Sequence, residues 1–374
     1  MSLSVQTNET SNNKSQQKKS PLLLNQKRKR DEKKETANIK IIDTDYFSKK
    51  ENLLKYVSKD KNCEFFNEKI EIEELISKGG FGSVFSGHLK TNLNKKVSLK
   101  FLMENVINKN QKPNYSEIII HKNLRNKNIC DFYGYFKINE GLCMVMEYFK
   151  FGDIENFKHN IIYKTTFSET FLNYLSKSIL DALQYLHERN KIIHMDIKPQ
   201  NILINDYLII KLTDFSVSYN YKNKEKEIEL PMVGTCYYMS PEVLDKTKNK
   251  IKIEDASKID LYSLGVTLFF LAFGDFPYNL KSVGPKDYEG IKNSIENNQL
   301  ILPKNKFSKK FLNFIQNLLN KDINKRYNIT QAMNDPWIKG SSILLDEKEK
   351  LFNSEKFLYE LLLNGVREFN NYVH

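Results

Sequence analysis

The chain has 374 residues, of which 40% are hydrophobic and 28% are charged, with 58 Lys and Arg against 46 Asp and Glu. No uninterrupted apolar run reaches the roughly 18 residues that span a bilayer, so we expect no membrane partner. Residues 1–60 hold 14 Lys and Arg against 8 Asp and Glu, half of the positive excess. Nucleic-acid binding is therefore not required to explain the charge.

The first 60 residues are rich in Ser, Asn, Gln and Lys, and we expect them to form a disordered basic tail. Within this tail, Lys27–Arg30 forms a short basic cluster. Two interpretations fit the cluster: a nuclear localisation signal or polyanion contact, and a solvated run of charges. We therefore expect a cytoplasmic and/or nuclear protein.

Strand patterns dominate the next part of the chain. Residues 68–103 contain short segments rich in β-branched and aromatic residues, and 131–149 predicts two further strands around a turn at 139–141. Between them, 114–125 predicts a helix with Ile118, Ile119 and Leu124 on its apolar face. His121 in this helix is either a packed core histidine or a titrating regulatory group.

Helical periodicity dominates the rest of the chain, and this order predicts an α+β fold of two lobes. The first is a small antiparallel sheet with one helix, and the second is mainly helical. Residues 341–374 predict a helical tail, whose apolar stripe within 342–370 either packs on the domain or forms an autoinhibitory or partner contact. The predicted domain is 65–338, with an N-lobe at 65–147, a C-lobe at 152–338, and later helices over 167–188, 258–273, 287–297, 307–320 and 329–334.

The segment HMDIKPQN, residues 194–201, carries the clearest chemistry in the sequence. It places Asp196, Lys198 and Asn201 at short, fixed spacing. Phosphoryl transfer to a hydroxyl needs a carboxylate that takes the proton, an ammonium that neutralises charge and a carboxamide that holds a metal ion. We therefore expect Asp196 and Lys198 to be catalytic and Asn201 to bind the metal.

Four further motifs flank this loop. The first is a Gly-rich turn, SKGGFGSV, whose glycines would let backbone N–H groups approach phosphate oxygens. The second is VSLK, in which a lysine lies between apolar neighbours, and the third is an apolar strand, MVMEY. Both precede the catalytic loop, and the fourth motif, DFS, follows it. These motifs are residues 77–84, 97–100, 144–148 and 214–216.

In order and spacing over about 68–338, the motifs resemble those of the eukaryotic protein kinase family, serine/threonine branch. The resemblance implies an enzyme that uses ATP and Mg²⁺ to transfer the γ-phosphate to hydroxyls of a protein substrate. It implies metal binding by Asn201 and Asp214, and a pair between Lys100 and Glu117. The implied ATP-binding residues are Ile76, Ser77, Lys78, Gly79, Gly80, Phe81, Gly82, Ser83, Val84, Lys100, Glu117, Met146, Glu147, Phe149 and Asp153.

The resemblance also implies contacts in the C-lobe. Thr235 would form hydrogen bonds near Asp196 and Lys198. Glu242 would pair with Arg326, and Asp260 would anchor the backbone of the catalytic loop. The helix near Glu117 is similar to that of polo-like kinases and HMDIKP to that of Wee-type kinases, so the subfamily stays open.

Two positions of the sequence bear on regulation. Met195 stands where the family has an arginine that clamps a phosphate on the activation loop, and Pro231 stands at the usual phosphate-accepting position. We therefore expect activity without activation-loop phosphorylation. Glu225, Glu227 and Glu229 either supply fixed negative charge there or are simply solvated.

Two alternative functions remain open. A pseudokinase scaffold is motivated by Ser77 and Ser216, which replace glycines of the family pattern, and by Met195. A dual-specificity or Wee-type kinase is motivated by the catalytic-loop sequence. Because Lys100, Asp196 and Asp214 are all retained, the sequence favours an active serine/threonine kinase.

Overall fold

A computed structural model describes residues 70–79, 82–89, 92–103, 116–138, 141–159, 166–245, 247, 250–280, 283–303 and 307–340. The predicted tails at 1–60 and 341–374 lie outside these residues, as do the Lys27–Arg30 cluster and two members of the Gly-rich turn, Gly80 and Phe81.

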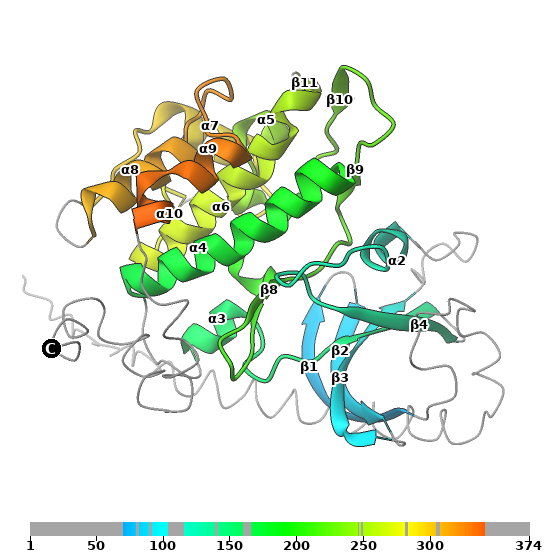
Figure 1. Cartoon of the computed structure of the whole chain (residues 1–374). Helices are drawn as coiled ribbons and strands as arrows, with labels where there is room; N and C mark the ends of the chain where they lie inside the picture. The colour runs from blue at the N-terminus through cyan, green and yellow to red at the C-terminus, as the bar shows by residue number, and fades with distance from the viewer. Residues whose placement is uncertain are drawn as a thin grey trace, which may run out of the picture. The chain divides into compact units, whose positions relative to one another are not determined.

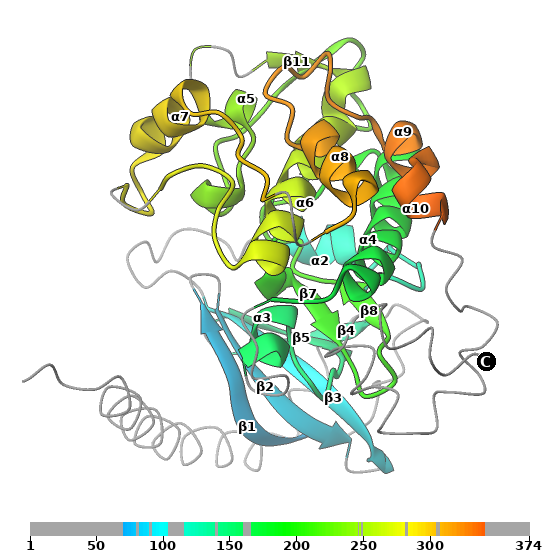
Figure 2. The same ribbon diagram turned by 90° about the vertical axis from the view of Figure 1, so that its left-hand side faces the viewer.

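The first part of the described chain is a five-stranded antiparallel sheet in the order β1-β2-β3-β5-β4 (Figures 1 and 2). The hairpin register closes at Gly79, which lies opposite Gly82, so the Gly-rich turn joins the first two strands as predicted. Valines, isoleucines and aromatic residues supply the strand-forming pattern. The strands are β1 Ile70–Gly79, β2 Gly82–Leu89, β3 Asn92–Met103, β4 Phe132–Ile138 and β5 Gly141–Glu147.

The helix that accompanies this sheet, α2, covers Ser116–His121 and ends before residue 125, the end of the predicted helix 114–125, whose first two residues lie outside the described part of the chain. Leu124 follows in a turn and is buried, as is Ile118. The assignment of Ile119 to the apolar face was wrong, because its side chain is 57% exposed. Successive helical residues turn by about 100°, so a residue between two buried ones can point to solvent.

The rest of the described chain is mainly helical, which confirms the predicted two-lobed α+β fold (Figure 2). Serine and asparagine side chains cap several helices by accepting a backbone N–H, as at Ser168, Ser308 and Asn328. The helices are α3 Ile154–Phe157, α4 Glu169–Gln184, α5 Pro241–Leu244, α6 Ala256–Phe273, α7 Tyr288–Asn297, α8 Lys309–Leu318, α9 Ile329–Asn334 and α10 Pro336–Gly340.

Short two-stranded ribbons and turns connect these helices. A π-helical turn, Tyr185–Asn190, extends α4, and 3₁₀ turns cover Pro199–Asn201, Cys236–Tyr238 and Ile253–Asp255. The ribbons pair β6 with β9, β7 with β8 and β10 with β11. Their strands are β6 Ile192–Ile193, β7 Ile202–Ile204, β8 Ile210–Leu212, β9 Tyr219–Asn220, β10 Glu227–Glu229 and β11 Lys250–Lys252.

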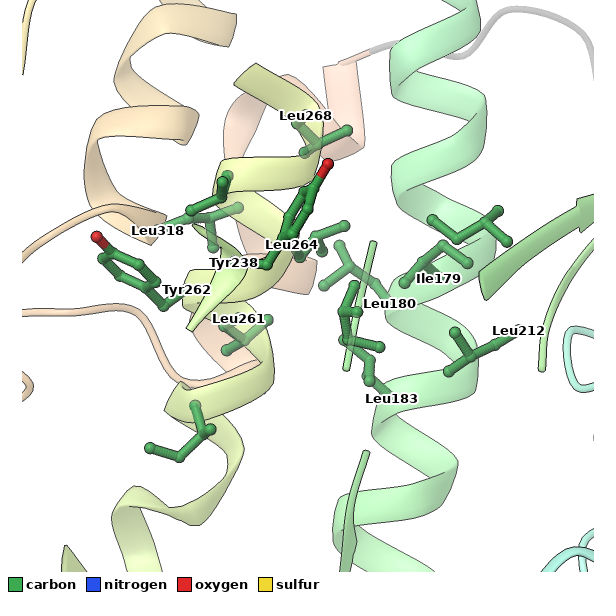
Figure 3. Close-up of a cluster of buried hydrophobic side chains, with 14 of the residues drawn as sticks. Ile179, Leu180, Leu183, Leu212, Tyr238, Leu261, Tyr262, Leu264, Leu268 and Leu318 are labelled. Atoms are coloured by element: carbon green, nitrogen blue, oxygen red, sulfur yellow. The ribbon is translucent and has the colours of Figure 1, made fainter. Parts of the chain in front are cut away.

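The core of the helical lobe is centred on α6. Figure 3 shows Leu180 and Leu183 of α4 beside Leu261 and Leu264 of α6, with Leu318 of α8 on the other side of α6. All five are fully buried. Because α6 contacts partners on both sides, it is apolar around nearly its whole circumference, as expected of a central helix.

Within the described residues, Ile253–Phe273 is long and apolar enough to cross a membrane by length and composition, but 83% of its most apolar window is buried inside the protein. The stretch includes Lys258 and Asp260, so it is not an uninterrupted apolar run. Its apolar surface is used for packing against α4 and α8, as expected of a core helix.

The segment between α2 and β4 connects the two lobes. Cys130 N donates to Leu212 O of β8 at 2.9 Å, and Leu212 N donates to Asn128 O at 2.8 Å. The side chain of Asn128 donates to Ile210 O at 2.8 Å and is buried. These bonds fix the end of α2 against the strand that leads into the DFS motif.

Candidate active site

The catalytic-loop residues converge on one carboxylate, that of Asp196. Lys198 Nζ lies 2.7 Å from Asp196 Oδ2, and Asn201 Nδ2 donates to the same oxygen at 2.9 Å. Thr235 N donates to Asp196 Oδ1 at 2.8 Å, and Lys198 Nζ donates to Thr235 Oγ1 at 2.6 Å. Both oxygens of the Asp196 carboxylate therefore accept hydrogen bonds. Because the side chain is buried, these bonds fix its orientation.

Helix α6 holds the backbone of this loop through Asp260, which is completely buried. Its carboxylate accepts His194 N at 2.8 Å and Met195 N at 2.9 Å. His187 Nε2 lies 2.8 Å from the same carboxylate. A buried charge requires such donors, and here the donors come from the loop that carries Asp196.

Left-handed backbone conformations occur at two positions of the site, Met195 with φ 69° and Asp214 with φ 66°. Neither is a glycine. Ser216 is not among the described residues with positive φ, so the conformation of DFS does not require a glycine at that position. Gly234 does require one, because its φ is 105° and a Cβ there would clash with the carbonyl oxygen of Met195.

The second cluster of charges is centred on Lys100 of β3. Its Nζ lies 2.7 Å from Glu117 Oε1 of α2 and 2.9 Å from Asp214 Oδ1. Burial opposes the charge on Lys100, but the two carboxylates outweigh it and raise the pKa of this lysine. Burial likewise opposes ionisation of Asp214, yet the Lys100 ammonium holds the pKa of Asp214 well below its usual value.

Asp214 and Asn201 offer oxygen atoms that fit a magnesium ion. Asp214 uses Oδ1 to accept from Lys100 and Ser216 N, and Asn201 uses Nδ2 to donate to Asp196. Ionised carboxylate and carboxamide oxygens are the ligands that Mg²⁺ prefers.

The residues predicted to surround a nucleotide base lie where the sheet meets the helical lobe. Met146 and Phe149 are buried, in a cluster with Ile118 and Phe132. Glu147, at the end of β5, pairs with Val97 of β3 in the sheet register. Met146 is therefore part of a buried hydrophobic cluster, and its place at the back of a nucleotide pocket stays a prediction.

The residues predicted to lie beside the phosphates are on the first hairpin, β1–β2. The side chains of Ile76, Ser77 and Lys78 are exposed, and those of Ser83 and Val84 are half-buried.

Asp153 was predicted near a ribose, and the structure also gives it a local role. Its Oδ1 accepts Asn156 N at 2.9 Å and its Oδ2 accepts Asn156 Nδ2 at 2.5 Å, so it caps α3. Burial raises the pKa of this carboxyl. The contact with a ribose stays a prediction.

Sequence reasoning missed a charged cluster beside β5. Lys211 Nζ of β8 lies 2.7 Å from Glu147 Oε2 and 3.0 Å from Asp131 Oδ2. Asp131 N donates to the same Glu147 carboxylate, and Glu147 N donates to Asp131 O. The signal that could have found it is a lysine in the middle of a buried apolar strand, which needs a partner.

Four rings form a continuous chain of tilted and edge-to-face contacts. The ring centroids of Phe132 and His121 are 5.5 Å apart, those of His121 and Phe215 are 4.8 Å apart, and those of Phe215 and His194 are 5.1 Å apart. His121 Nε2 donates to Cys130 O at 2.7 Å. Burial lowers the pKa of His121 to about 4, so this residue is a neutral core histidine at pH 7.

The predicted pair between Glu242 and Arg326 is also formed. The guanidinium donates to both Glu242 oxygens, with Arg326 Nη2 lying 3.0 Å from Oε2. Arg326 is buried, donates to Asn320 O and lies over the Tyr262 ring at 4.8 Å. This bidentate pair fixes the end of the activation segment to the helical core.

A family model described as the protein kinase domain matches residues 70–338. The chain belongs to the protein kinase family. The matched residues include both charge clusters, the Gly-rich hairpin and the Glu242–Arg326 pair, so the kinase domain carries the full set of charged groups described above.

The curated relatives of this kinase domain include several named as serine/threonine-protein kinases. A probable myosin light chain kinase of Dictyostelium discoideum is 30% identical over 74% of this chain and 54% of its own length. The serine/threonine-protein kinase dst2 of the same organism is 29% identical over 78% of this chain and 24% of its own length. A MAP kinase kinase of Saccharomyces cerevisiae, MKK1/SSP32, is 30% identical over 78% and 56%. The chain thus spans about half or less of the length of these relatives.

Proposed function

We propose that this kinase uses ATP and Mg²⁺ to transfer the γ-phosphate to serine and threonine hydroxyls of a protein substrate. One observation carries the proposal: both charge clusters are formed at the same time. Lys100 is bound to Glu117 and Asp214, while Lys198 is bound to Asp196 and Thr235. Phosphoryl transfer depends on positioning and charge neutralisation, and this arrangement supplies both.

Each residue then has a specific task. The Asp196 carboxylate accepts the proton of the substrate hydroxyl, and Lys198 Nζ neutralises charge on the phosphoryl group. Lys100 Nζ holds the α- and β-phosphates while Glu117 keeps the lysine in place. Asn201 and Asp214 hold Mg²⁺, which supplies further charge neutralisation when bound. Backbone atoms of Glu147 and Phe149 bind the adenine.

The same proposal includes activity without phosphorylation of the activation segment. Met195 is buried in the helical core and has no side-chain donor for a phosphate, while Pro231 has no hydroxyl to accept one. The Thr235–Asp196 and Thr235–Lys198 bonds are formed with an unmodified chain. Phosphatase treatment should therefore leave activity unchanged, and loss of activity on treatment would contradict this part.

The central test is incorporation of γ-phosphate into a generic protein substrate by the full chain and by its Asp196→Asn variant. We expect Asp196→Asn to lower the rate at least 100-fold, because general base catalysis contributes about 10²–10⁴-fold. Asp206→Asn, at an exposed turn, is the matched control and should have wild-type activity. Equal incorporation by wild type and Asp196→Asn would instead favour the pseudokinase alternative.

A further inference from the structure

The activation segment contains a strand that pairs with a distant part of the chain. Strand β10 lies between the DFS motif and Thr235, and it pairs antiparallel with β11, which precedes α6 (Figure 1). Glu227 lies opposite Lys252, and Glu229 lies opposite Lys250. A further backbone bond extends the ribbon, since Ile253 N donates to Lys226 O at 3.0 Å.

The two strands are complementary in both charge and polarity. The central residues Ile228 and Ile251 face each other and are only 1% and 7% exposed, within the core of the helical lobe. The flanking glutamates and lysines are exposed on the opposite face. Opposite charges at directly facing positions of an antiparallel pair attract, and each such pair stabilises the ribbon modestly.

The ribbon connects the activation segment to the helix that anchors the catalytic loop. β11 leads through a 3₁₀ turn directly into α6, where Asp260 accepts the backbone N–H groups of His194 and Met195. The other end of the segment is held by β9, which pairs with β6 just before the catalytic loop. The segment is thus fixed at both ends to elements that position Asp196.

We propose that the β10–β11 ribbon positions the activation segment in place of a phosphate, with Glu227 and Glu229 as built-in anions and Lys250 and Lys252 as their cationic partners. This inference rests on the proposed function, since it names what replaces phosphorylation. It favours fixed negative charge over a merely solvated acidic run, because two of the glutamates lie opposite lysines in a paired strand. Lys252 Nζ also lies 3.7 Å from Glu254 Oε1, so its attraction to Glu227 is the cross-strand one that the register sets.

The test compares four variants of the full chain. Lys250→Glu/Lys252→Glu and Glu227→Lys/Glu229→Lys each place like charges opposite one another, and the combined quadruple variant restores opposite charges in reversed order. Lys222→Glu/Lys224→Glu is the matched control, with the same charge change at exposed positions outside the ribbon. Two readouts are measured: hydrogen exchange of the amides of 226–229, and steady-state kinetics with peptide and ATP.

We expect each reversed pair to exchange about tenfold faster at 226–229, because two attractive cross-strand pairs become repulsive. The kcat/KM for peptide should fall several-fold, while the KM for ATP stays within about twofold, since both strands of the ribbon belong to the helical lobe and not to the sheet that carries the predicted phosphate-binding residues. The quadruple variant should recover the wild-type exchange rate at 226–229 and the wild-type kcat/KM for peptide. The control variant should match the wild type in both. Raising the salt concentration should bring the exchange rates of the wild type and the reversed variants closer together, because salt screens exposed charges.

The outcomes separate this inference from the proposed function. If the wild type transfers no phosphate, the proposed function fails, and hydrogen exchange still decides whether the charges hold the ribbon. Unchanged exchange in both reversed variants, or no recovery in the quadruple variant, would overturn the charge pairing. Faster exchange with unchanged peptide kinetics would overturn the positioning role.

Discussion

Gly234 shows how strongly one residue of the activation segment is constrained by the catalytic loop. Its φ is 105°, and a Cβ would clash with Met195 O. We expect Gly234→Ala to lower kcat at least tenfold and to cost about 1–3 kcal/mol of stability, the usual range for local backbone strain. Thermal unfolding and steady-state kinetics measure both.

Gly284→Ala is the control for this substitution, because nothing lies within 4 Å of the added Cβ and no positive φ is present there. Wild-type kcat in Gly234→Ala would show that the segment can move away from Met195 without affecting Asp196.

His121 makes the stability of the protein depend on pH. An unfolded histidine has a pKa of about 6.5, whereas burial lowers the pKa of His121 to about 4. Between these values the unfolded state binds more protons, so stability falls as the pH falls. We expect the free energy of unfolding to drop by about 2 kcal/mol from pH 7 to pH 5 on account of this residue.

Urea unfolding at the two pH values measures this effect. His121→Gln keeps a donor for Cys130 O but does not titrate, so its stability should change less between pH 7 and pH 5. His159→Gln, at an exposed histidine, should keep the wild-type pH dependence. The prediction is wrong if His121→Gln and the wild type lose stability equally.

At the scale of elements, the contact between α6 and α8 depends on Gly265. A Cβ at this position would lie 2.9 Å from Leu318 Cβ and 3.0 Å from Leu319 Cδ2. We expect Gly265→Ala to destabilise the protein by about 1–2 kcal/mol, because overpacking outweighs the gain in helix propensity. Denaturant unfolding measures the change.

A second substitution makes this test specific. Leu319→Ala creates space beside Gly265, so the double variant Gly265→Ala/Leu319→Ala should be more stable than the sum of the two single effects predicts. Simple additivity would mean that the space made at Leu319 does not relieve the added methyl group, so that the contact with Leu318 Cβ opposes it.

Elements differ in how far the sequence predicts them. The catalytic loop was predicted residue by residue, because Asp196, Lys198 and Asn201 are close in sequence and their spacing alone carries chemistry. The β10–β11 ribbon was not predicted, since its strands are three residues long and are paired only through tertiary structure. The C-terminal end of α2 was also predicted too late in the chain, because helix ends depend on local turns.

At the scale of the whole molecule, the Lys211 cluster joins β8 of the helical lobe to β5 of the sheet. Lys211 is largely buried between Glu147 and Asp131, which come from opposite ends of the β4–β5 hairpin. No periodic pattern signals such a contact, because it joins positions far apart in sequence. The same holds for the ion pair between Lys100 and Asp214. Both residues were identified in the sequence, but their contact could be found only from the fold.

We expect Lys211→Met to raise the KM for ATP about three- to tenfold with a small effect on kcat, because two carboxylates beside the backbone that we propose to bind adenine lose their shared cation. Steady-state kinetics at varied ATP measure this change, and Lys211→Arg should recover part of it. Lys150→Met removes an exposed pair with Asp206 at 3.5 Å and should leave the KM unchanged. An unchanged KM in Lys211→Met would show that the cluster serves stability alone.

Helix α6 has a consequence for how damage to the protein would appear. The buried Asp260 that orients the catalytic loop is also part of the central helix of the core, so no partly folded chain lacking α6 can retain catalysis. Substitutions that loosen the packing of α4 or α8 against α6 would shift the Asp260 carboxylate. They would therefore disturb the catalytic loop that this carboxylate holds. Loss of activity would then coincide with loss of folded protein. In a cell, both would be observed as a lower amount of functional kinase.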